Sequence, residues 1–369
     1  MPAPLSDPIF PSTRREFIAR SGRGLGLLAL SGLAPALLAR TTVDGGTGGR
    51  ILVLVQLTGG NDGLNTVVPY EDADYYRLRP TLALAKGQVL RLSDTLGLHP
   101  SCAALHALFG EGKLAVVQNV GYPQPNRSHF RSTEIWETAS ASDEFRPDSW
   151  IGRYLDHAGA GLPVASRDAL GLCLRSGLPR FCRSHPHGEA SGPIPALEPV
   201  IDAYRPAVPY PANSFAGALR QVAALMAADR PTRIYRVALS GFDTHSNQAH
   251  QHANLLATLS TGLAAFQRDL ERQGLADQVC TLTWSEFGRR PGENESRGTD
   301  HGTAAPLFLL GTRLRGGLHG TAPSLQLAPE QDLAHRTDFR RVYATLLERW
   351  LGCPAAAVLG GEFRPLPLV

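Results

Sequence analysis

Apolar runs recur along the chain, and several end abruptly in an acidic residue or a histidine. The runs predict strands at 51–57, 113–120, 169–173, 233–239, 279–284 and 306–310. Amphipathic spacing predicts helices at 101–109, 150–156, 215–228, 254–273 and 338–351, and another that begins near Ser128. Strands and helices alternate, and the run at 113–120 is continuously apolar, as expected where both faces of a parallel sheet are covered. The pattern therefore predicts an α/β fold with a mostly parallel central sheet and helices on both faces.

Length and composition are those of a globular protein with a sizeable core. The chain has 369 residues, of which 43% are hydrophobic and 19% charged. We expect a single domain over 50–369, with an irregular insertion rich in Pro and Gly at 140–215. The net charge is only +3 and the basic residues are scattered, so no nucleic-acid partner is predicted.

Residues 1–39 are predicted to be an export signal. A paired arginine, Arg14-Arg15, precedes an apolar stretch from Leu25 to Leu38, which is typical of a twin-arginine signal peptide. An uncleaved anchor is the alternative, but the stretch is short and broken by Gly and Pro for a span of about 20 residues. We therefore expect a periplasmic or secreted protein, delivered by the twin-arginine translocase, with no stable membrane span after cleavage at Ala36 or Ala39.

Five cysteines are present, so at least one has no intrachain partner. Cys173 and Cys182 lie close together in a loop-like region. They are the best disulfide candidates if the protein reaches an oxidising compartment.

Carboxylates and imidazoles gather at the predicted strand ends. Ligand sites in open α/β sheets lie beyond the carboxyl ends of the strands, and such side chains bind hard and borderline cations. The sequence therefore predicts a divalent metal, which could be zinc, manganese or calcium. The candidate ligands are Asp62, Asp243, His245, Glu286, Asp300 and His301, and Glu286 could instead act as a general base.

Each of these positions also has a plainer interpretation. The alternatives are an Asn-Asp-Gly turn for Asp62, a helix N-cap for Asp243 with His245 on the surface, a salt bridge from Glu286 to the following arginines, and a surface loop for Asp300-His301. The nearby His250 and His252 are expected on a solvent-exposed face, and His319 is a weaker candidate ligand.

A second group of candidates, Asn126-Arg127-Ser128-His129, opens a predicted helix. A hydroxyl there lies over backbone N–H groups and the positive helix end, which stabilises an alkoxide or a bound oxyanion. The catalytic candidates are Ser128 as nucleophile, Arg127 as a clamp for phosphate or sulfate, and His129 as the group that stabilises the leaving oxygen. The alternative is that Ser128 simply caps the helix.

Six segments carry a resemblance to a known family. They are LVLVQLTGGNDGLNTVVPY, LAVVQNVGYPQPNRSHF, GFDTH, WSEFGRR, GTDHG and DFRRVYATLLERWLG, in this order. They resemble the twin-arginine-exported bacterial proteins grouped as domain of unknown function family 1501, which is similar in fold to the alkaline phosphatase/sulfatase superfamily. The resemblance implies a three-layer sandwich, one or two divalent metals, a Ser, Thr or modified Cys nucleophile, and transfer of phosphate, sulfate or phosphonate.

The resemblance also implies roles for individual residues. By topology, Asp62 matches the metal ligand after the first strand, Ser128 the nucleophile, and Asp243 with His245 the next ligands. Topology gives Glu286 and His301 the remaining places, whereas the motif alone would match Asp300-His301 to the superfamily's Asp-His pair. Asp300 is therefore expected as a ligand or as a support for one. The C-x-P-x-R motif that yields formylglycine is absent, so ordinary sulfatase chemistry is not expected.

Two functional hypotheses follow. The first is an exported metal-dependent hydrolase that acts on small anionic phosphate or sulfate esters. The alternative is a non-catalytic periplasmic binding or assembly protein with an operon-encoded protein partner. An oxidoreductase is a weaker third hypothesis, because no GxGxxG fingerprint follows a strand.

Overall fold

The computed structural model describes residues 49–160, 171–175, 178–181 and 197–369. The predicted export signal and Cys182 lie outside the described residues, so the signal and the disulfide stay predictions. Outside the predicted Cys173–Cys182 pair, Cys102, Cys280 and Cys353 are buried and free. Among the helices of the described ranges, none combines the length and the apolar character needed to cross a membrane.

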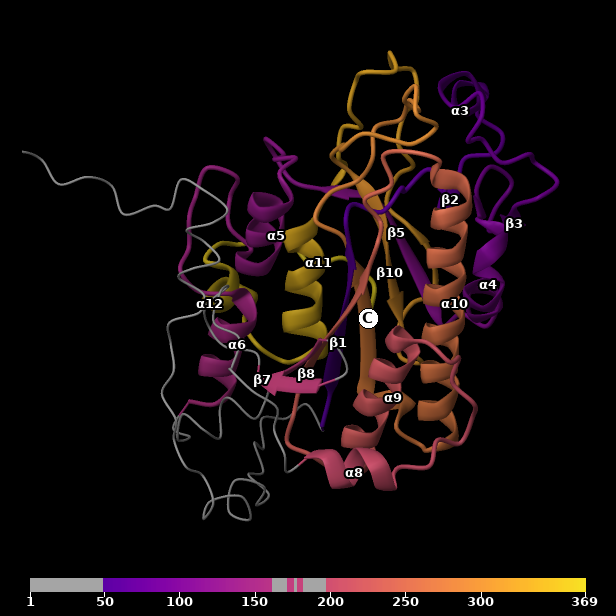
Figure 1. Ribbon diagram of the computed structural model, residues 1–369. Helices are drawn as coiled ribbons and strands as arrows, with labels where there is room; N and C mark the ends of the chain where they lie inside the picture. The colour runs from indigo at the N-terminus through magenta and orange to yellow at the C-terminus, as the bar shows by residue number, and fades with distance from the viewer. Residues whose placement is uncertain (1–48, 161–170, 176–177, 182–196) are drawn as a thin grey trace, which may run out of the picture.

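A nine-stranded sheet forms the centre of the molecule, in the order β11-β5-β10-β9-β1-β8-β6-β7, with β12 paired to β5 (Figure 1). β1 pairs in parallel with β8 and β9, whereas β10 is antiparallel to both of its neighbours. The predicted sheet, mostly parallel, is therefore confirmed. The strands are β1 (Ile51–Thr58), β5 (Leu114–Gly121), β6 (Gly171–Arg175), β7 (Leu178–Phe181), β8 (Ile234–Ser240), β9 (Val279–Trp284), β10 (Ala305–Leu310), β11 (Gly317–His319) and β12 (Thr337–Asp338).

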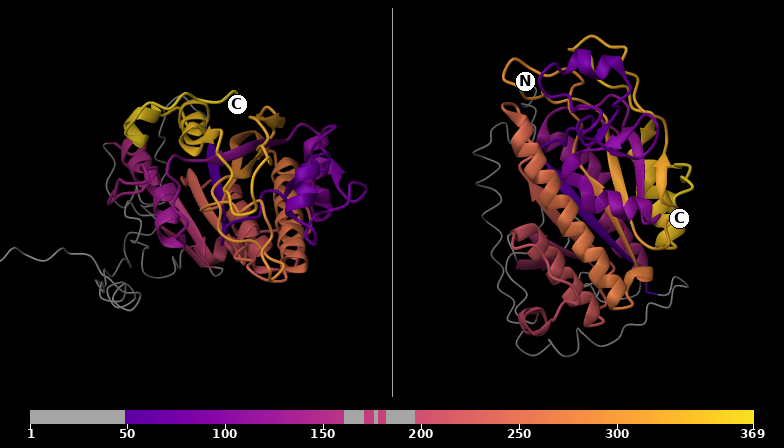
Figure 2. Two further views of the ribbon diagram at one scale, coloured as in Figure 1. Left: turned by 90° about the horizontal axis from the view of Figure 1, so that it is seen from above. Right: turned by 90° about the vertical axis from the view of Figure 1, so that its right-hand side faces the viewer.

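Helices cover both faces of this sheet, as Figures 1 and 2 show. Alternate side chains of β1 enter different cores, Leu52 and Leu54 on one face and Val53 and Val55 on the other. All four are at most 2% exposed, so burial drives both layers onto the sheet. The first face carries α5 (His129–Thr138), α6 (Trp150–Ala158), α11 (Phe339–Thr345) and α12 (Ala355–Leu359), and the second carries α4 (Ala103–Gly110), α9 (Ser214–Ala227) and α10 (Gln248–Arg272).

A smaller antiparallel sheet, β2-β4-β3, lies beside one end of the main sheet. Its strands are β2 (Val67–Val68), β3 (Leu90–Arg91) and β4 (Gly97–Leu98), and α3 (Ala73–Leu78) lies in the loop between β2 and β3. Val68, Tyr75 and Leu333 contribute to a third apolar cluster in this region. The insertion predicted at 140–215 contains α6, β6, β7 and a short α8 (Glu198–Ala203).

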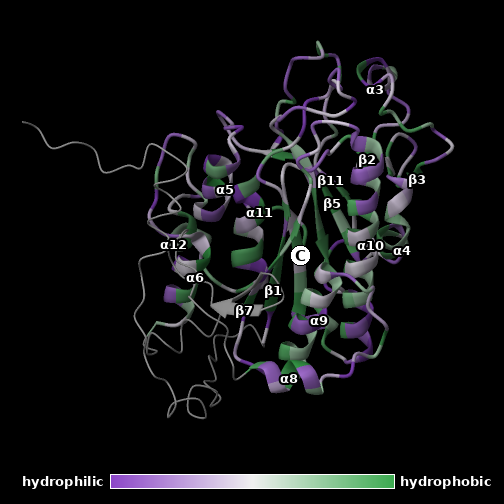
Figure 3. Cartoon of the chain, in the orientation of Figure 1, coloured by the Kyte–Doolittle hydropathy of each residue, from purple (hydrophilic) through white to green (hydrophobic). Residues whose placement is uncertain are grey.

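Strand direction decides where the polar loops meet. β5, β8 and β9 run in the same direction as β1, and β10 runs in the opposite direction. The segments that follow β1, β5, β8 and β9 and the segment that precedes β10 therefore emerge at one edge of the sheet. Apolar strands fill the centre of Figure 3, and polar loops crowd this edge, at the top of the view. It is the carboxyl edge at which α/β sheets place their ligand sites.

Candidate metal centre

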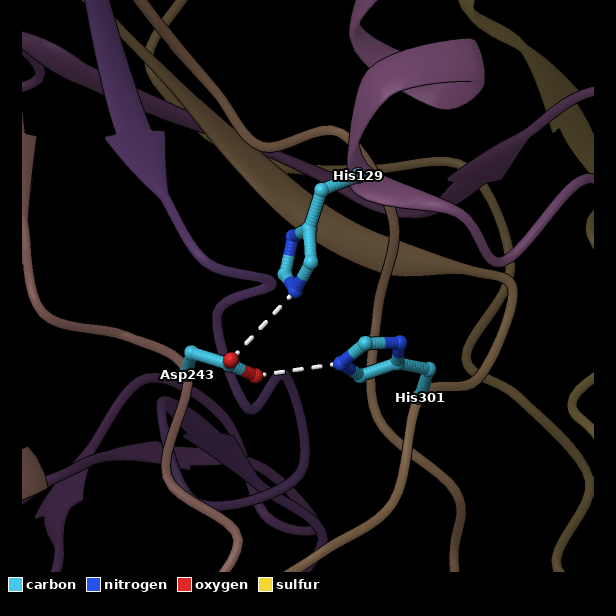
Figure 4. Close-up of side chains that lie close together, drawn as sticks. All are labelled: His129, Asp243 and His301. Atoms are coloured by element: carbon cyan, nitrogen blue, oxygen red, sulfur yellow. Dashed lines mark hydrogen bonds and ion pairs between the residues drawn. The ribbon is translucent and has the colours of Figure 1, made fainter. Parts of the chain in front are cut away.

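Three side chains from distant parts of the chain meet at the carboxyl edge of the sheet (Figure 4). His129 begins α5, Asp243 follows β8, and His301 precedes β10. The Nε2 atom of His301 lies 3.0 Å from Oδ1 of Asp243, and Nε2 of His129 lies 3.4 Å from Oδ2. One ligand atom from each residue falls within 4.8 Å of the other two, which is the spacing of a possible metal site.

His245 adds a fourth donor to the cluster. Its Nε2 atom lies 3.0 Å from Oδ1 of Asp243 and 3.0 Å from Nε2 of His301. Thr244 between the two ligand candidates is 1% exposed, whereas the side chains of Asp243 and His245 are both 46% exposed. This alternation is what an extended D-x-H segment produces, since its first and third side chains point to the same side.

The opposite ring nitrogen of each imidazole faces an oxygen atom. Nδ1 of His129 lies 2.8 Å from Oε1 of Glu286, and Nδ1 of His301 lies 2.9 Å from the carbonyl oxygen of Arg127. Nδ1 of His245 lies 3.6 Å from Oδ1 of Asp300. Carbonyl and carboxylate oxygens accept hydrogen bonds, so the contacts of His129 and His301 place the proton of a neutral ring on Nδ1. The 3.6 Å separation at His245 is longer than a hydrogen bond. The Nε2 lone pairs are then directed into the cluster, as in carboxylate–histidine–metal arrangements.

The protonation states leave acceptors facing one another. Burial lowers the pKa of His301, which favours the neutral ring with a bare Nε2. Burial alone would raise the pKa of Asp243, but its contact with His301 and the hydrogen bond from Arg289 hold it well below its ordinary value. The hydrogen bond to Glu286 raises the pKa of His129. A proton on His129 can satisfy only part of the cluster, whereas a cation would bind the lone pairs of His129, Asp243 and His301 together.

The residues present fit a bound divalent ion. Two ligand atoms of an ion held at about 2.0–2.1 Å by imidazole and carboxylate lie roughly 3.3 Å apart in a tetrahedral shell. The Nε2–Oδ separations of 3.0–3.4 Å are close to that value. The ligand atoms come from His129, Asp243 and His301, and His245 offers a further nitrogen beside Asp243 and His301.

Glu286 supports the cluster and does not point into it. Its side chain is fully buried, and its Oε1 atom accepts hydrogen bonds from the Gly59 amide at 2.8 Å and from His129. The sequence predicted Glu286 as a direct ligand. In the structure its carboxylate lies against Nδ1 of His129 and orients that imidazole. Asp300 lies behind His245 in the same way, and a hydrogen bond from Asn294 is the main reason for its lowered pKa.

Arg289 holds Asp243 in place, a role that the sequence pattern did not suggest. The guanidinium is 1% exposed and donates to Oδ1 of Asp243 at 2.7 Å. It also donates to the carbonyl oxygens of Gly60 and Thr299 at 2.7 Å. The alternative interpretation of Glu286 was a salt bridge to the arginines that follow it. The buried charge is compensated instead by Asp243 and by carbonyl oxygens from the loops after β1 and before β10.

The structure places Asp62 away from the imidazoles. Its side chain is 0% exposed, and its two oxygens accept from the Arg79 guanidinium at 2.6 and 2.9 Å. Burial opposes ionisation, but Arg79 holds the pKa of Asp62 below its ordinary value. Gln248 also donates to this carboxylate and accepts from Thr244 and Thr299. Asp62 therefore stabilises the loops that carry the cluster, because its own lone pairs are occupied.

The other predicted residues occupy varied positions. Ser128 is the exposed N-cap residue of α5, yet its hydroxyl makes no capping hydrogen bond. The Arg127 guanidinium forms an ion pair with Asp332 at 3.2 Å.

His252 was expected on a solvent-exposed face, but it is only 2% exposed. Its Nε2 atom lies 3.0 Å from Oδ1 of Asn61, and burial lowers its pKa to about 4. His319 lies on β11, with Nε2 against the Arg315 carbonyl oxygen.

Comparison with protein families gives one match. A family model described as "Protein of unknown function (DUF1501)" matches residues 199–351. That segment carries Asp243, His245, Glu286 and His301, whereas His129 precedes it. No curated protein matches the sequence of the chain.

Comparison with solved structures gives weak similarities. Murine ectonucleotide pyrophosphatase/phosphodiesterase 5, in complex with AMP, has a TM-score of 0.43 at 12% identity, over 87% of this chain and 100% of that one. The periplasmic domain of EptC from Escherichia coli, in complex with Zn, has 0.39 at 11%, over 73% and 75%. A protein of the alkaline phosphatase superfamily from Vibrio parahaemolyticus has 0.36 at 9%, over 79% and 71%. These similarities carry no argument about the chain, so we argue the function from the site's own residues.

Proposed function

We propose that the protein is an exported metal-dependent hydrolase of phosphate or sulfate esters. The observation that carries the proposal is the convergence of three imidazole Nε2 atoms on Asp243, each ring backed by an oxygen at Nδ1. A divalent ion bound there would polarise a phosphoryl or sulfuryl oxygen and lower the pKa of an attacking group. A set of three nitrogens and one oxygen suits zinc or manganese better than calcium, which prefers oxygen ligands.

We assign the nucleophile to Ser128. Its hydroxyl starts α5, makes no capping bond, and is joined in the chain to the ligand candidate His129. In the proposed reaction the Ser128 oxygen bonds to phosphorus or sulfur, the ester alcohol leaves with a proton, and water then releases the acid from the serine. The Arg127 guanidinium, exposed and paired with Asp332, would exchange that carboxylate for the anionic group of the substrate.

The test is a panel of aryl phosphate, phosphate diester and aryl sulfate substrates with the full chain loaded with zinc or manganese. We expect turnover of at least one ester class, and Ser128→Ala should lower kcat by on the order of 1000-fold while the metal is retained. Ser296→Ala is the matched control, because Ser296 is exposed in the loop before His301. Absence of turnover in every metal-loaded sample would contradict the proposal and favour the alternative role in binding or assembly.

The export step of the proposal depends on the predicted signal at 1–39. If the twin-arginine route delivers the protein, replacing Arg14 and Arg15 by lysine should leave it in the cytoplasm when cells are fractionated. Export of the double variant at the wild-type level would contradict this route without affecting the proposed reaction.

A further inference from the structure

Two arginines share one carboxylate close to the candidate metal centre. Nη1 of Arg127 lies 3.2 Å from Oδ2 of Asp332, and Nε of Arg290 lies 3.8 Å from Oδ1 of the same carboxylate. The first contact is a hydrogen bond, whereas the second is too long for one. Within the described ranges, the buried Nε of Arg290 and the buried Oδ1 of Asp332 have no hydrogen-bond partner. The carboxylate is therefore an incomplete partner for these two guanidinium groups.

A larger oxyanion would suit the two guanidinium groups better. A buried donor or acceptor without a partner is costly, and a carboxylate has only two oxygens to offer. Phosphate and sulfate groups carry more oxygens around one centre, and the planar fork of a guanidinium matches their geometry. The two arginines thus form a site for a tetrahedral anion that Asp332 fills imperfectly.

Backbone contacts place both arginines beside the metal cluster. The carbonyl oxygen of Arg127 lies 2.9 Å from Nδ1 of His301. The backbone amide of Arg290 donates to the carbonyl oxygen of Asp300 at 3.0 Å. The hydrogen bond from Asn294 does most to lower the pKa of Asp300, and the positive charge of Arg290 lowers it further. The charge of Arg290 therefore acts next to the candidate ligands.

The loop that carries Asp332 is fixed by the two residues that follow it. The hydroxyl of Thr303, two residues after His301, donates to the carbonyl oxygen of Leu333. Nδ2 of Asn119 donates to the carbonyl oxygen of the next residue, at 2.9 Å. The side chain of Asp332 is 28% exposed, so rotation of this side chain alone can release the arginines while the backbone stays in place.

We propose that Arg127 and Arg290 together hold the anionic group of the ester, and that Asp332 occupies this anion subsite while no substrate is bound. The inference rests on the proposed function and adds Arg290 as a second anion-binding residue. The phosphoryl or sulfuryl group would displace the Asp332 carboxylate, which therefore competes with the substrate and with released phosphate or sulfate. Removal of this carboxylate should strengthen anion binding, whereas a carboxylate that only holds the arginines in place would weaken binding when removed.

The test titrates the full chain with inorganic phosphate and, separately, with inorganic sulfate, and measures the affinities by calorimetry. Chelator-treated and zinc-loaded samples separate the contribution of the arginines from that of the metal. In the chelator-treated sample we expect Asp332→Asn to bind both anions about 10-fold more tightly than the wild type, because the competing carboxylate is gone. Glu330→Gln is the matched control and should change neither affinity, since Glu330 is exposed in the same loop and loses the same charge.

Arg290→Gln should weaken the binding of both anions by about 10-fold. Arg290→Lys keeps the charge without the planar fork, so it should lose less, and it replaces Arg290→Gln in the test if that variant does not fold. Arg313→Gln is the control for the lost positive charge and should bind both anions as the wild type does. Arg313 is exposed and follows β10, at the opposite edge of the sheet.

An affinity of Asp332→Asn equal to or below that of the wild type would overturn the proposal, as would an equal gain in Glu330→Gln. Unchanged anion binding in the Arg290 variants would overturn it as well. Ester turnover, measured on the zinc-loaded samples, is a separate readout. Anion binding that depends on Arg290 without turnover of any ester would uphold the subsite and contradict the proposed hydrolysis, and turnover with anion binding independent of Arg290 would do the reverse.

Discussion

At the scale of single residues, the orientation of each imidazole decides what the cluster can bind. His129, His245 and His301 all turn Nδ1 toward an oxygen and Nε2 toward Asp243. Glu286 and the Arg127 carbonyl fix this orientation at hydrogen-bond distance, and Asp300 lies 3.6 Å from His245. Because a proton at Nδ1 leaves a lone pair at Nε2, the outer oxygens matter as much as the rings they hold.

Glu286→Gln tests the role of these outer oxygens. The substitution keeps the size of the side chain but weakens the acceptor that orients His129. We expect the affinity for zinc or manganese to fall about 10–100-fold, the usual effect of losing an outer partner of a ligating histidine. Competition titration with a chromophoric chelator measures the affinity.

Glu293→Gln is the matched control for this measurement. Glu293 accepts hydrogen bonds from the Thr81 and Leu82 amides, so its replacement should leave the metal affinity unchanged. An equal loss in both variants would indicate a general destabilisation, and no loss in Glu286→Gln would mean that this carboxylate does not act through the metal.

Sequence spacing predicted most of the cluster but could not separate the side chains that meet there from those that lie behind them. Asp243, His245 and His301 lie at the strand ends where the pattern placed them. Asp62 satisfies the same rule, but its lone pairs are taken by Arg79, which lies in a segment without a periodic pattern. His129 was predicted as a catalytic group, and its place beside Asp243 depends on the fold of α5 against the sheet.

At the scale of elements, the Asp62–Arg79 pair fastens the loop after β1 to the end of α3. Both side chains are 0% exposed. Arg79 also donates to the carbonyl oxygens of Arg290 and Pro291 at 3.1 and 2.8 Å, in the loop that leads toward His301. The pair therefore joins the loop after β1, the end of α3 and the segment at 290–291. Its loss should lower the free energy of unfolding.

Asp62→Asn should destabilise the fold by about 3–5 kcal/mol, because it leaves the Arg79 charge buried without a full counter-charge. The lowered pKa of Asp62 means that the ion pair contributes stability above the unfolded pKa of about 3.9 and loses it as the pH falls through the lower folded value. The wild-type protein should therefore lose stability more steeply than the variant below about pH 4. Urea unfolding between pH 7 and pH 3 measures both effects.

The exposed pair between Asp74 and Arg77 on α3 provides the control, since its side chains are 29% and 48% exposed. Asp74→Asn should cost less than about 1 kcal/mol. If Asp62→Asn were as mild as this control, the pair would not be holding these segments together. Retention of metal by folded Asp62→Asn is also expected, because Asp62 lies outside the cluster.

The main elements could be predicted from periodicity, and their pairing could not. The strand at 279–284 has the predicted bounds, whereas α10 begins at Gln248 instead of near 254. Its first turns lack an apolar face because Gln248 and His252 are buried through hydrogen bonds. The antiparallel direction of β10 also leaves no local signal, since it is set by pairing with strands far away in the chain.

At the scale of the whole molecule, burial on both faces of the sheet leaves its carboxyl edge as the place where polar loops can meet. His129, Asp243 and His301 meet there. The matched family segment, residues 199–351, contains Asp243 and His301 but not His129. The complete cluster therefore needs a part of the chain outside the matched segment. The predicted architecture is confirmed, and the use of this edge for a metal remains the central claim.

Metal content of the purified full chain tests that claim most directly. After incubation with zinc or manganese and exhaustive dialysis, elemental analysis should find at least about one ion per chain. His301→Ala and Asp243→Asn should lose it, whereas His319→Ala should retain it, because His319 lies on β11 with Nε2 against the Arg315 carbonyl oxygen. A wild-type protein that retains no ion, or a His301→Ala variant that retains it fully, would contradict the account.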